Sequence, residues 1–288
     1  MAAFLFCLVS CGTRQEKEVG LQFYSVRTLI NSPEKYAANH ADVLSRLSDM
    51  GYKTLELYGY KDRSFFGRSV AEFKSDLDAA GLKALSTHTT RKLSAEELAA
   101  GAPSEETMTW WRNCIEDHKA LGCEYIVCPA MSLPETLKDL QTYCNYYNAV
   151  GKLCAENCIS FGYHNHSHEF KKVEGEVVYD YMLTHTDPRY VFFEMDVYWA
   201  CMAQAYPVEY FNKYPGRFRL LHIKDHAELG QSGMVGFESI FDAARVSGME
   251  HYFVEIEKSL IGDIMESCRV SADYLLDADY VRSSYVGR

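Results

Sequence analysis

Three histidines stand at alternate positions in the stretch GYHNHSHEF, residues 162–170. If this stretch is a strand, His164, His166 and His168 share one face, because successive side chains of a strand point to opposite sides. Imidazole nitrogens bind transition metals and transfer protons near neutral pH. The stretch is thus a candidate metal site. A cluster of surface histidines and the polar end of a buried strand are the two other interpretations.

Five further apolar runs of the sequence also end in a carboxylate or an imidazole. Together with the first histidine of that stretch, the strand-end residues are Glu56, His88, His164, Asp196, His222 and Glu255. Each of them alone has a simple structural explanation, such as a turn cap or a surface ion pair. Gathered at one mouth, they would be costly to bury unless a metal ion or a substrate compensates their charge. We therefore predict that they form a functional metal centre.

Two histidines and two carboxylates offer a mixed set of nitrogen and oxygen ligands. Such a set suits Mn²⁺, Zn²⁺, Co²⁺ or Fe²⁺ better than Ca²⁺, and it lacks the thiolates of a structural zinc site. We expect one divalent ion, with Mn²⁺ slightly favoured. An ion held in this way polarises a carbonyl and an adjacent hydroxyl and acidifies the C–H group between them. A neighbouring carboxylate can then remove that proton.

The elements that must position these residues follow from the hydrophobic pattern. Eight runs rich in β-branched and aromatic residues alternate with longer segments of helical period. The runs are VGLQFYSV, KTLELYG, LKALSTHT, EYIVCPAM, CISFGYHN, YVFFEMDV, FRLLHIKD and HYFVEIE. Such repeated strand–helix units are typical of an α/β fold with a parallel sheet, and eight of them close a (β/α)8 TIM barrel. A doubly wound open sheet is the competitor, but no glycine-rich loop follows the first run.

Capping signals place several helix ends. Helix starts are predicted at Ser32–Pro33, at Ser69 with Glu72, and at Ser132 with Glu135. Helix ends are predicted at Gly51, Gly81 and Gly122. The largest insertion, residues 91–106, follows the third strand, so we expect it to overhang the mouth of the barrel as a candidate lid.

Composition restricts the class of protein. The chain has 288 residues, of which 48% are hydrophobic and 14% aromatic, which is ample for a buried core. A net charge of -11 argues against a nucleic-acid partner, because such binding depends on Lys and Arg at the phosphates. No linker divides the chain, so a single domain is expected. The ten cysteines form no CxxC pair and predict neither a zinc ribbon nor a thioredoxin motif.

The N-terminal run AAFLFCLVSCG is short, apolar and followed by the polar TRQEKE. It resembles a bacterial lipobox with Cys11 as the lipidated residue, and it is too short to span a bilayer. We therefore expect residues 1–18 to be a signal or lipobox-like arm and residues 19–288 to be the barrel. This predicts a periplasmic or outer-membrane-anchored lipoprotein, attached to the membrane only through its lipid. The alternative is a cytoplasmic protein with an apolar arm.

Four motifs carry a family resemblance: YHNHSHEF, FFEMDVYWA, LLHIKDH and FESIFDAARVSGMEHYFVEIE. In order and spacing they resemble the xylose isomerase-like TIM barrels, specifically the sugar phosphate isomerase/epimerase group, over residues 20–276. The resemblance implies one divalent metal held by the residues that end strands five to eight, and proton transfer on a ketose-like substrate through an enediolate. Those strand-end ligands are here His164, Asp196, His222 and Glu255.

The sequence departs from the epimerases of this family at strand five, where they carry a second glutamate and this chain has His164. An imidazole does not replace a carboxylate base, so Glu255 is expected to serve as the base, alone or with His166. Lys224 is expected either to neutralise a developing oxyanion or to pair with Asp225. His168 is expected to lie outward. The predicted substrate-binding residues are Glu56, His88, Trp199 and Tyr24.

The predicted activity is a metal-dependent sugar isomerase or epimerase that acts on a monosaccharide or keto-sugar. A lyase or dehydratase on a 3-keto-glycoside or inosose would use the same metal and base and is the alternative. A barrel that binds sugars without catalysis is a further alternative. Endonucleases with this barrel use three zinc ions, and the acidic charge together with ligands for one metal weighs against that class.

Overall fold

The structure is a computed structural model that describes residues 16–287. The lipobox-like run and Cys11 lie outside the described residues, so the lipid anchor and the predicted location stay predictions. Within residues 16–287, no helix is both long enough and apolar enough to cross a membrane.

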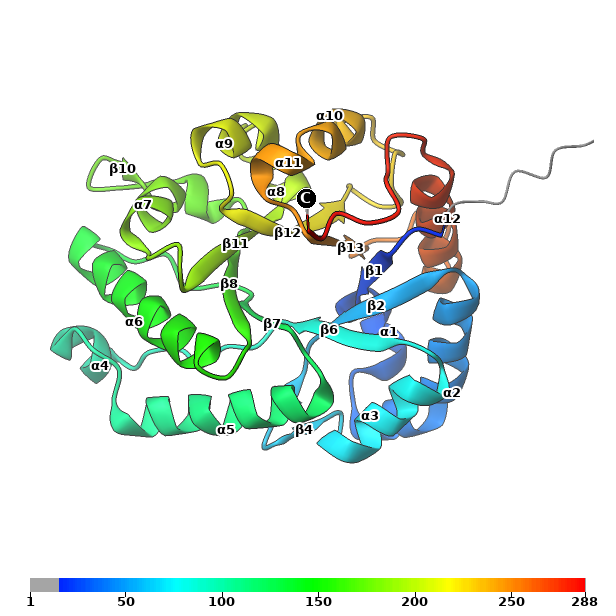
Figure 1. The fold of residues 1–288 in the computed structure, drawn as a ribbon, viewed down its shortest axis with the longest axis horizontal. Helices are drawn as coiled ribbons and strands as arrows, with labels where there is room; N and C mark the ends of the chain where they lie inside the picture. Colours follow the sequence, from blue (N-terminus) through cyan, green and yellow to red (C-terminus); the bar gives the residue numbers. More distant parts are fainter. Residues whose placement is uncertain (1–15, 288) are drawn as a thin grey trace, which may run out of the picture.

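Eight parallel strands form the barrel that the sequence predicts (Figure 1). They are β1 (Val19–Gln22), β2 (Tyr52–Leu57), β6 (Lys83–Thr87), β7 (Tyr125–Cys128), β8 (Ser160–His164), β11 (Val191–Asp196), β12 (Phe218–Lys224) and β13 (His251–Glu255). Their order around the sheet is β6-β2-β1-β13-β12-β11-β8-β7. A parallel bridge between His88 and Val127 closes the ring between β6 and β7.

Helices surround the barrel and connect successive strands (Figure 1). They are α1 (Arg27–Ile30), α2 (Pro33–Asp49), α3 (Val70–Ala79), α4 (Ala95–Ala100), α5 (Glu105–Leu121), α6 (Leu137–Ala155), α7 (Val178–His185), α8 (Val197–Met202), α9 (Pro207–Lys213), α10 (Phe237–Asp242), α11 (Ala244–Ser247) and α12 (Ile264–Asp277). Two small antiparallel sheets lie in the loops: β3 (Tyr60–Lys61) with β4 (Ser64–Phe65) and β5 (Arg68–Ser69), and β9 (Lys172–Val173) with β10 (Glu176–Val177). Neither small sheet could be predicted from the sequence, because strands of two residues leave no measurable period.

The interior of the barrel changes from apolar to charged along the strands. A separate apolar cluster consists of Leu85, Tyr125, Val127, Phe192, Leu220 and Phe253. Two residues further along the same strands come Glu194, His222 and Glu255, which therefore point into the barrel as well. All three are buried. The alternation of the strands thus delivers charged side chains to the C-terminal end of a closed, dry interior.

The predicted caps are mostly confirmed. Ser32 caps α2 with Pro33 at its first turn, and Ser69 and Glu72 form a capping box on α3. Gly51, Gly81 and Gly122 all have positive φ at helix ends. The predicted start at Ser132 and Glu135 is wrong, because α6 begins later and is capped by Thr136, whose hydroxyl accepts from the amide of Asp139. Thr136 with Asp139 offers the same three-residue spacing one turn further on.

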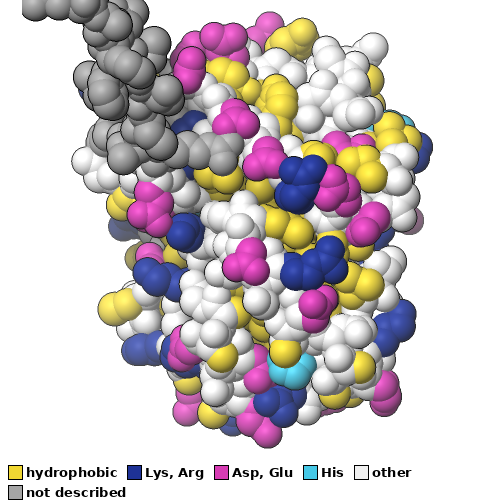
Figure 2. Space-filling view, turned by 90° about the vertical axis from the view of Figure 1, so that its right-hand side faces the viewer, with side chains coloured by type: hydrophobic (Ala, Val, Ile, Leu, Met, Phe, Trp, Pro, Cys, Tyr) yellow, Lys and Arg dark blue, Asp and Glu magenta, His cyan; other side chains and the backbone are white. Residues whose placement is uncertain are grey.

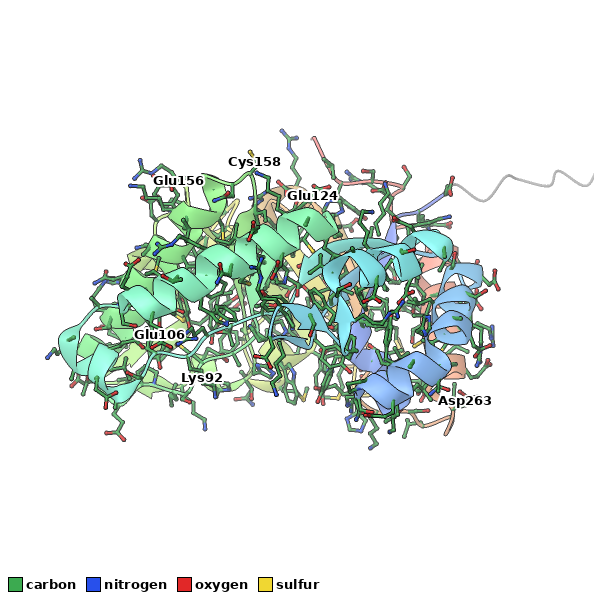
Figure 3. All side chains as sticks on the ribbon, turned by 90° about the horizontal axis from the view of Figure 1, so that it is seen from below. Lys92, Glu106, Glu124, Glu156, Cys158 and Asp263 are labelled. Atoms are coloured by element: carbon green, nitrogen blue, oxygen red, sulfur yellow. The ribbon has the colours of Figure 1, made fainter. Side chains whose placement is uncertain are left out.

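The insertion at residues 91–106 lies at the C-terminal end of the barrel. Lys92 and Glu106 border it on the same side as Asp263, opposite Glu124 and Cys158, which precede strands (Figure 3). It folds into α4, which Ser94 and Glu97 cap reciprocally. Its contacts run to α6, where the hydroxyl of Tyr146 donates to the carbonyl of Arg91. No residue of this segment lines the cavity between Tyr24, His88 and His164, so the described structure shows the segment packed on the surrounding helices.

The surface over α2 and α12 mixes acidic and basic side chains without a basic stripe (Figure 2). On α2, Arg46 lies 3.6 Å from Asp42, and on α12 Arg269 pairs with both Glu266 and Asp273. Charges that are balanced in this way do not offer the continuous positive surface that a phosphate backbone requires.

Gly162 on β8 should not tolerate a side chain. A Cβ atom at this position would lie 2.5 Å from the ring of Phe192 on the neighbouring strand. We expect Gly162→Ala to lower the free energy of unfolding by about 1–3 kcal/mol, because the interior has no room for the methyl group. Urea denaturation measures the change, and Lys83→Ala, at an exposed strand position, is the control with an expected change below about 0.5 kcal/mol. Equal stability of the two variants would contradict the close packing of β8 on β11.

Candidate metal centre

The structure brings the four predicted ligands together. His164, Asp196, His222 and Glu255 each offer one ligand atom, and these atoms all lie within 4.8 Å of one another. They come from the ends of four neighbouring strands, β8, β11, β12 and β13, and all four are buried. The strand-end rule that selected them from the sequence therefore places them correctly in space.

Three of these ligand atoms have no hydrogen-bond partner. His164 Nε2, Asp196 Oδ2 and His222 Nδ1 are each buried and unsatisfied. His164 Nε2 lies 3.6 Å from Asp196 Oδ2, which lies 3.9 Å from His222 Nδ1. An unpaired polar atom that is buried costs about 1–3 kcal/mol, so three facing one another need a common partner. Ligands on a tetrahedral ion with bonds near 2.1 Å lie about 3.4 Å apart, so a divalent cation fits between them.

His164 presents its free nitrogen to this centre because its other nitrogen is occupied. Nδ1 lies 3.0 Å from the carbonyl oxygen of Pro129, which can only accept, so Nδ1 carries the proton. Burial and the nearby His222 lower the pKa of His164, which keeps the ring neutral. The lone pair is then on Nε2 and points at the carboxylate of Asp196.

His222 is oriented by a carboxylate on its far side. Its Nε2 lies 2.5 Å from Glu56 Oε2, and Gln22 and Ser86 also donate to that carboxylate at 2.8 and 2.7 Å. Burial opposes the charge on Glu56, but His88 and His222 outweigh it and lower its pKa. The sequence analysis assigned Glu56 to the substrate. The structure instead places it fully buried behind His222, where it fixes Nδ1 of that ring toward the metal centre.

Asp196 is held by backbone contacts on both sides. Its Oδ1 accepts from the amide of Trp199 at 2.8 Å, which caps α8. The side chain of Asn165 bonds the amide and the carbonyl of Asp196 at 3.2 and 3.3 Å. One carboxylate oxygen is therefore fixed in the protein and Oδ2 is left for the centre.

Glu194 is a buried carboxylate that the sequence analysis missed. Its Oε2 lies 2.8 Å from His88 Nε2 and 3.4 Å from His222 Nε2. Burial and the Glu56 charge raise the pKa of Glu194 to about 7. Burial opposes the charge on His88, but Glu56 and Glu194 raise its pKa to about 9. The available signal was a glutamate two residues before Asp196 in an otherwise apolar strand, which puts both on the same face.

His88 contacts both the cavity and the buried carboxylates below it. Its ring lines the cavity at the mouth, as predicted for a substrate-binding residue, but its Nε2 is occupied by Glu194 and Glu56 below. Together with Glu194, His164 and His222 it forms a second group of possible ligands. In that group His88 Nε2 is bonded to Glu194 Oε2, whereas Glu194 Oε1 and His164 Nε2 have no hydrogen-bond partner.

Glu255 adjoins both the centre and a lysine. Its Oε2 lies 3.4 Å from His222 Nδ1 and 3.3 Å from Lys224 Nζ, and Lys224 also lies 3.0 Å from Glu257. Burial raises the pKa of Glu255, but Lys224 and His222 overcome this and hold the pKa well below its usual value. Glu255 is therefore ionised at neutral pH, as either a ligand or a base requires.

A cavity of about 290 Å³ opens beside the centre. It is lined by Tyr24, Tyr58, His88, Pro129, His164, His166, Glu255 and Glu257. Tyr24 reaches it from a short 3-10 helix, η1 (Phe23–Val26), because β1 ends at Gln22, earlier than predicted. Trp199 is not among the lining residues, but its ring centroid lies 5.9 Å from that of His166.

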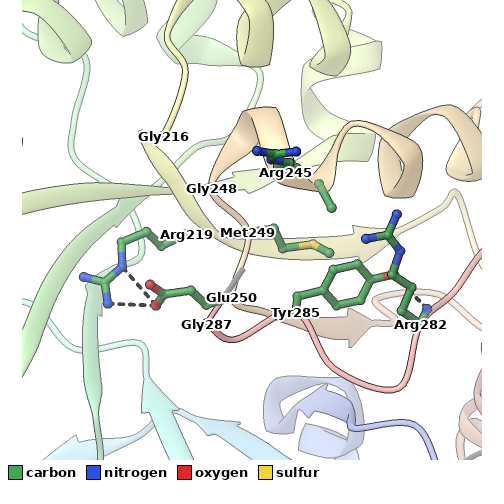
Figure 4. A pocket seen from close by; sticks show the side chains of 10 residues that line it. Gly216, Arg219, Arg245, Gly248, Met249, Glu250, Arg282, Tyr285 and Gly287 are labelled. Atoms are coloured by element: carbon green, nitrogen blue, oxygen red, sulfur yellow. Dashed lines mark hydrogen bonds and ion pairs between the residues drawn. The ribbon is translucent and has the colours of Figure 1, made fainter.

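A larger hollow of about 390 Å³ lies at the opposite end of the barrel (Figure 4). Arg219, Arg245 and Arg282 line it, and Arg219 is paired with Glu250. It contains none of the candidate metal ligands. The smaller cavity is therefore the one that the chemistry selects.

The remaining histidines of the opening stretch have separate environments. Burial and the nearby His164 lower the pKa of His166 to about 4, so its ring is neutral at physiological pH, and its Nδ1 is buried without a partner. His168 turns away in a second 3-10 helix, η2 (His168–Phe170), with its side chain 32% exposed and its Nε2 3.1 Å from the carbonyl of Met131. His166 and His168 nevertheless lie close together, and with Glu169 they form a third group of possible ligands.

The sequence of the chain matches the model of the xylose isomerase-like TIM barrel family over residues 44–273. The chain therefore belongs to this family, as its motifs predict. None of the curated proteins matches its sequence.

Two solved structures of sugar phosphate isomerase/epimerases from Parabacteroides distasonis are similar to the chain. One is 37% identical with a TM-score of 0.83, and the match covers 92% of this chain and 100% of that one. The other is 33% identical with the same TM-score, over 95% of this chain and 100% of that one. A probable 3-DHS dehydratase from Bacillus anthracis is 13% identical with a TM-score of 0.68, over 90% and 98% of the two chains, and shares the fold.

Removal of a ligand should abolish metal binding without unfolding the barrel. We expect Asp196→Ala and His164→Ala each to weaken Mn²⁺ binding by at least about 100-fold, since loss of a supporting residue alone costs 10–100-fold. Metal content after dialysis measures the loss, and circular dichroism checks the fold. His185→Ala, at the exposed end of α7, is the matched control that should bind one ion per chain. Full metal content in Asp196→Ala would contradict the assigned ligand set.

Metal binding should strengthen as the pH rises. Burial lowers the pKa of His222, but Glu194 and Glu56 outweigh it and raise the pKa well above its usual value, so Nδ1 must release a proton before it can bind an ion. One released proton changes the affinity by about tenfold per pH unit below that pKa. Calorimetric titration with Mn²⁺ between pH 6 and pH 8, in buffers of different ionisation enthalpy, measures the affinity and the number of protons released on binding.

Glu56→Gln removes one charge that raises the pKa of His222, so the affinity of this variant should depend less on pH. A wild-type affinity that stays constant over this range would contradict the use of Nδ1 as a ligand.

Proposed function

We propose that this protein is a divalent-metal-dependent sugar isomerase or epimerase that removes a proton from the carbon next to a carbonyl of a monosaccharide or keto-sugar. The observation that carries the proposal is the set of three buried, unpaired ligand atoms beside a cavity that an ionised carboxylate lines. Membership of the family and the similarity to two sugar phosphate isomerase/epimerases support it.

His164, Asp196, His222 and Glu255 would hold the ion. A divalent ion bound there supplies Lewis-acid polarisation of the substrate's carbonyl and hydroxyl oxygens. The residues of the chain do the rest: Glu56 and Pro129 fix the ring orientations, and Asn165 fixes the backbone of Asp196. The centre is thereby organised before a substrate arrives, which lowers the cost of reorganisation during the reaction.

Glu255 is the proposed base. Its carboxylate lines the cavity and is ionised, and Lys224 beside it is positioned to stabilise negative charge that develops on the substrate oxygen. His166 also lines the cavity and is neutral, so it can accept a proton as Glu255 can. Return of the proton to the neighbouring carbon gives isomerisation, and return to the opposite face of the same carbon gives epimerisation.

A lyase or dehydratase on a 3-keto-glycoside or inosose is the second candidate. The observation that favours it is His164 at the end of β8, which leaves Glu255 as the carboxylate base beside the centre. Elimination needs one base and a leaving group β to the carbonyl. Metal, cavity and proton removal are otherwise shared with the isomerase.

Solvent deuterium exchange tests the proposal. The Mn²⁺-loaded protein in D₂O should incorporate deuterium next to the carbonyl of a ketose, a 3-keto-glucoside or an inosose, detected by mass spectrometry. Glu255→Gln should slow incorporation by at least about 100-fold, the usual contribution of a general base. Glu238→Gln, an exposed carboxylate on α10, should exchange like the wild type. Metal-loaded protein that exchanges none of these substrates would contradict the enzyme and favour a sugar-binding barrel.

A further inference from the structure

The charges around the cavity are already balanced by the protein. The lining residues include Glu255 and Glu257 but neither Arg nor Lys. The nearest lysine, Lys224, lies between these two carboxylates at 3.3 and 3.0 Å. Among the described residues the lining thus carries no cation in excess of its carboxylates.

Arg27, which lies next to Tyr24, already donates hydrogen bonds to two carbonyl groups of the protein. Its Nη1 donates to the carbonyl of Tyr24 at 3.2 Å and its Nη2 to the carbonyl of Glu257 at 3.0 Å. The guanidinium lies over the ring of Tyr24, 4.4 Å from the centroid. Arg27 therefore ties the loop after β1 to the loop after β13 and stiffens the aromatic wall of the cavity.

The loops after β12 and β13 would be the place for a phosphate, since in many TIM barrels the loops after strands seven and eight bind one. In this chain a carboxylate of the protein already accepts hydrogen bonds from donors of the loop after β13 and of α12. Glu228 is 2% exposed, and its Oε1 accepts from the amides of Leu260 and Ile261 at 3.0 and 3.3 Å and from the hydroxyl of Ser267 at 2.7 Å.

Two other acidic side chains act similarly in these loops. Asp225 accepts from the amide of His226 at 2.7 Å, and Asp263 accepts from the first amides of α12. Phosphate sites are built from free backbone amides at helix N-termini and from Arg or Lys. The amides of His226, Leu260, Ile261 and the first turn of α12 are thus each bonded by a carboxylate of the protein.

The aromatic side of the cavity suits an uncharged ring. Tyr24 lines it with 38% of its surface exposed, and its ring packs edge-on against Tyr58 at 5.0 Å. Aromatic faces with a few polar groups around them are typical of sites for neutral ligands, including sugars.

From these observations we infer that the substrate is an unphosphorylated, neutral sugar, and that sugar phosphates are excluded by charge. The inference rests on the proposed function and concerns the substrate class of the same site. The bound ion would be neutralised by Asp196 and Glu255, and the charge of Lys224 is offset by Glu257 at 3.0 Å, so a phosphate dianion would bring negative charge into a cavity with no cation in excess of its carboxylates. The two similar proteins from Parabacteroides distasonis are named sugar phosphate isomerase/epimerases, and we infer that this chain differs from them in its substrate.

Matched pairs of substrates test the inference. The Mn²⁺-loaded protein is assayed for deuterium exchange with D-fructose and D-fructose 6-phosphate and with D-ribulose and D-ribulose 5-phosphate. The neutral member of a pair should show a kcat/KM at least about tenfold higher, because like charges brought together disfavour binding. Equal or faster exchange of a phosphorylated member would overturn the inference and leave the proposed function intact.

If no exchange occurs, measurements of sugar binding distinguish failure of the proposed function from failure of the inference about the neutral substrate. Absence of exchange in both pairs would count against the proposed function, and calorimetric titration of the same sugars would still decide the inference. Tighter binding of the neutral member supports it, whereas tighter binding of the phosphorylated member, or binding of neither, overturns it.

Glu257→Gln provides a variant test. It frees Lys224 from one of its two carboxylates and should shift the preference toward the phosphorylated member, with Glu238→Gln as the exposed control that leaves the ratio unchanged. An unchanged ratio in Glu257→Gln would contradict the role of charge.

Discussion

Polar side chains that point into a closed barrel lose contact with bulk water, so each of them must find its partner inside the protein. In this barrel most of them do: Glu56 binds His222, and Glu194 binds His88. At the ends of β8, β11 and β12, His164 Nε2, Asp196 Oδ2 and His222 Nδ1 face one another and have no hydrogen-bond partner. The proposed metal centre and the assignment of the cavity beside it both depend on this local deficit of hydrogen bonds.

The contact between Glu56 and His222 decides which nitrogen is available. Without a carboxylate on its far side, the imidazole could carry its proton on either nitrogen, and its lone pair could point away from the other ligands. Gln22 and Ser86 hold Glu56 in place, so residues from β1, β2 and β6 determine the chemistry at the end of β12. The side of the barrel that contributes no ligand therefore controls the side that does.

The fold and the proximity of the four candidate ligands could be predicted from the sequence for a physical reason. Parallel strands bury both faces and read as apolar runs, so a carboxylate or imidazole at the end of a run stands out. The same reasoning could not separate Glu56 from a substrate-binding residue, because the depth of a side chain below the mouth depends on the stagger between strands. Glu194 could not be selected in the same way, because it lies inside the apolar run of β11 and not at its end. The end of β1 at Gln22 could not be predicted from the sequence. The aromatic residues Phe23 and Tyr24, which form the start of η1, also have high strand propensity.

Diffraction at the manganese absorption edge from crystals loaded with Mn²⁺ tests the central claim most directly. The account predicts one anomalous peak bound by His164 Nε2, Asp196 Oδ2, His222 Nδ1 and a carboxylate oxygen of Glu255, at bond lengths of about 2.0–2.3 Å. A peak between His88 and Glu194, or a loaded crystal whose ion lies away from these four strand ends, would contradict it.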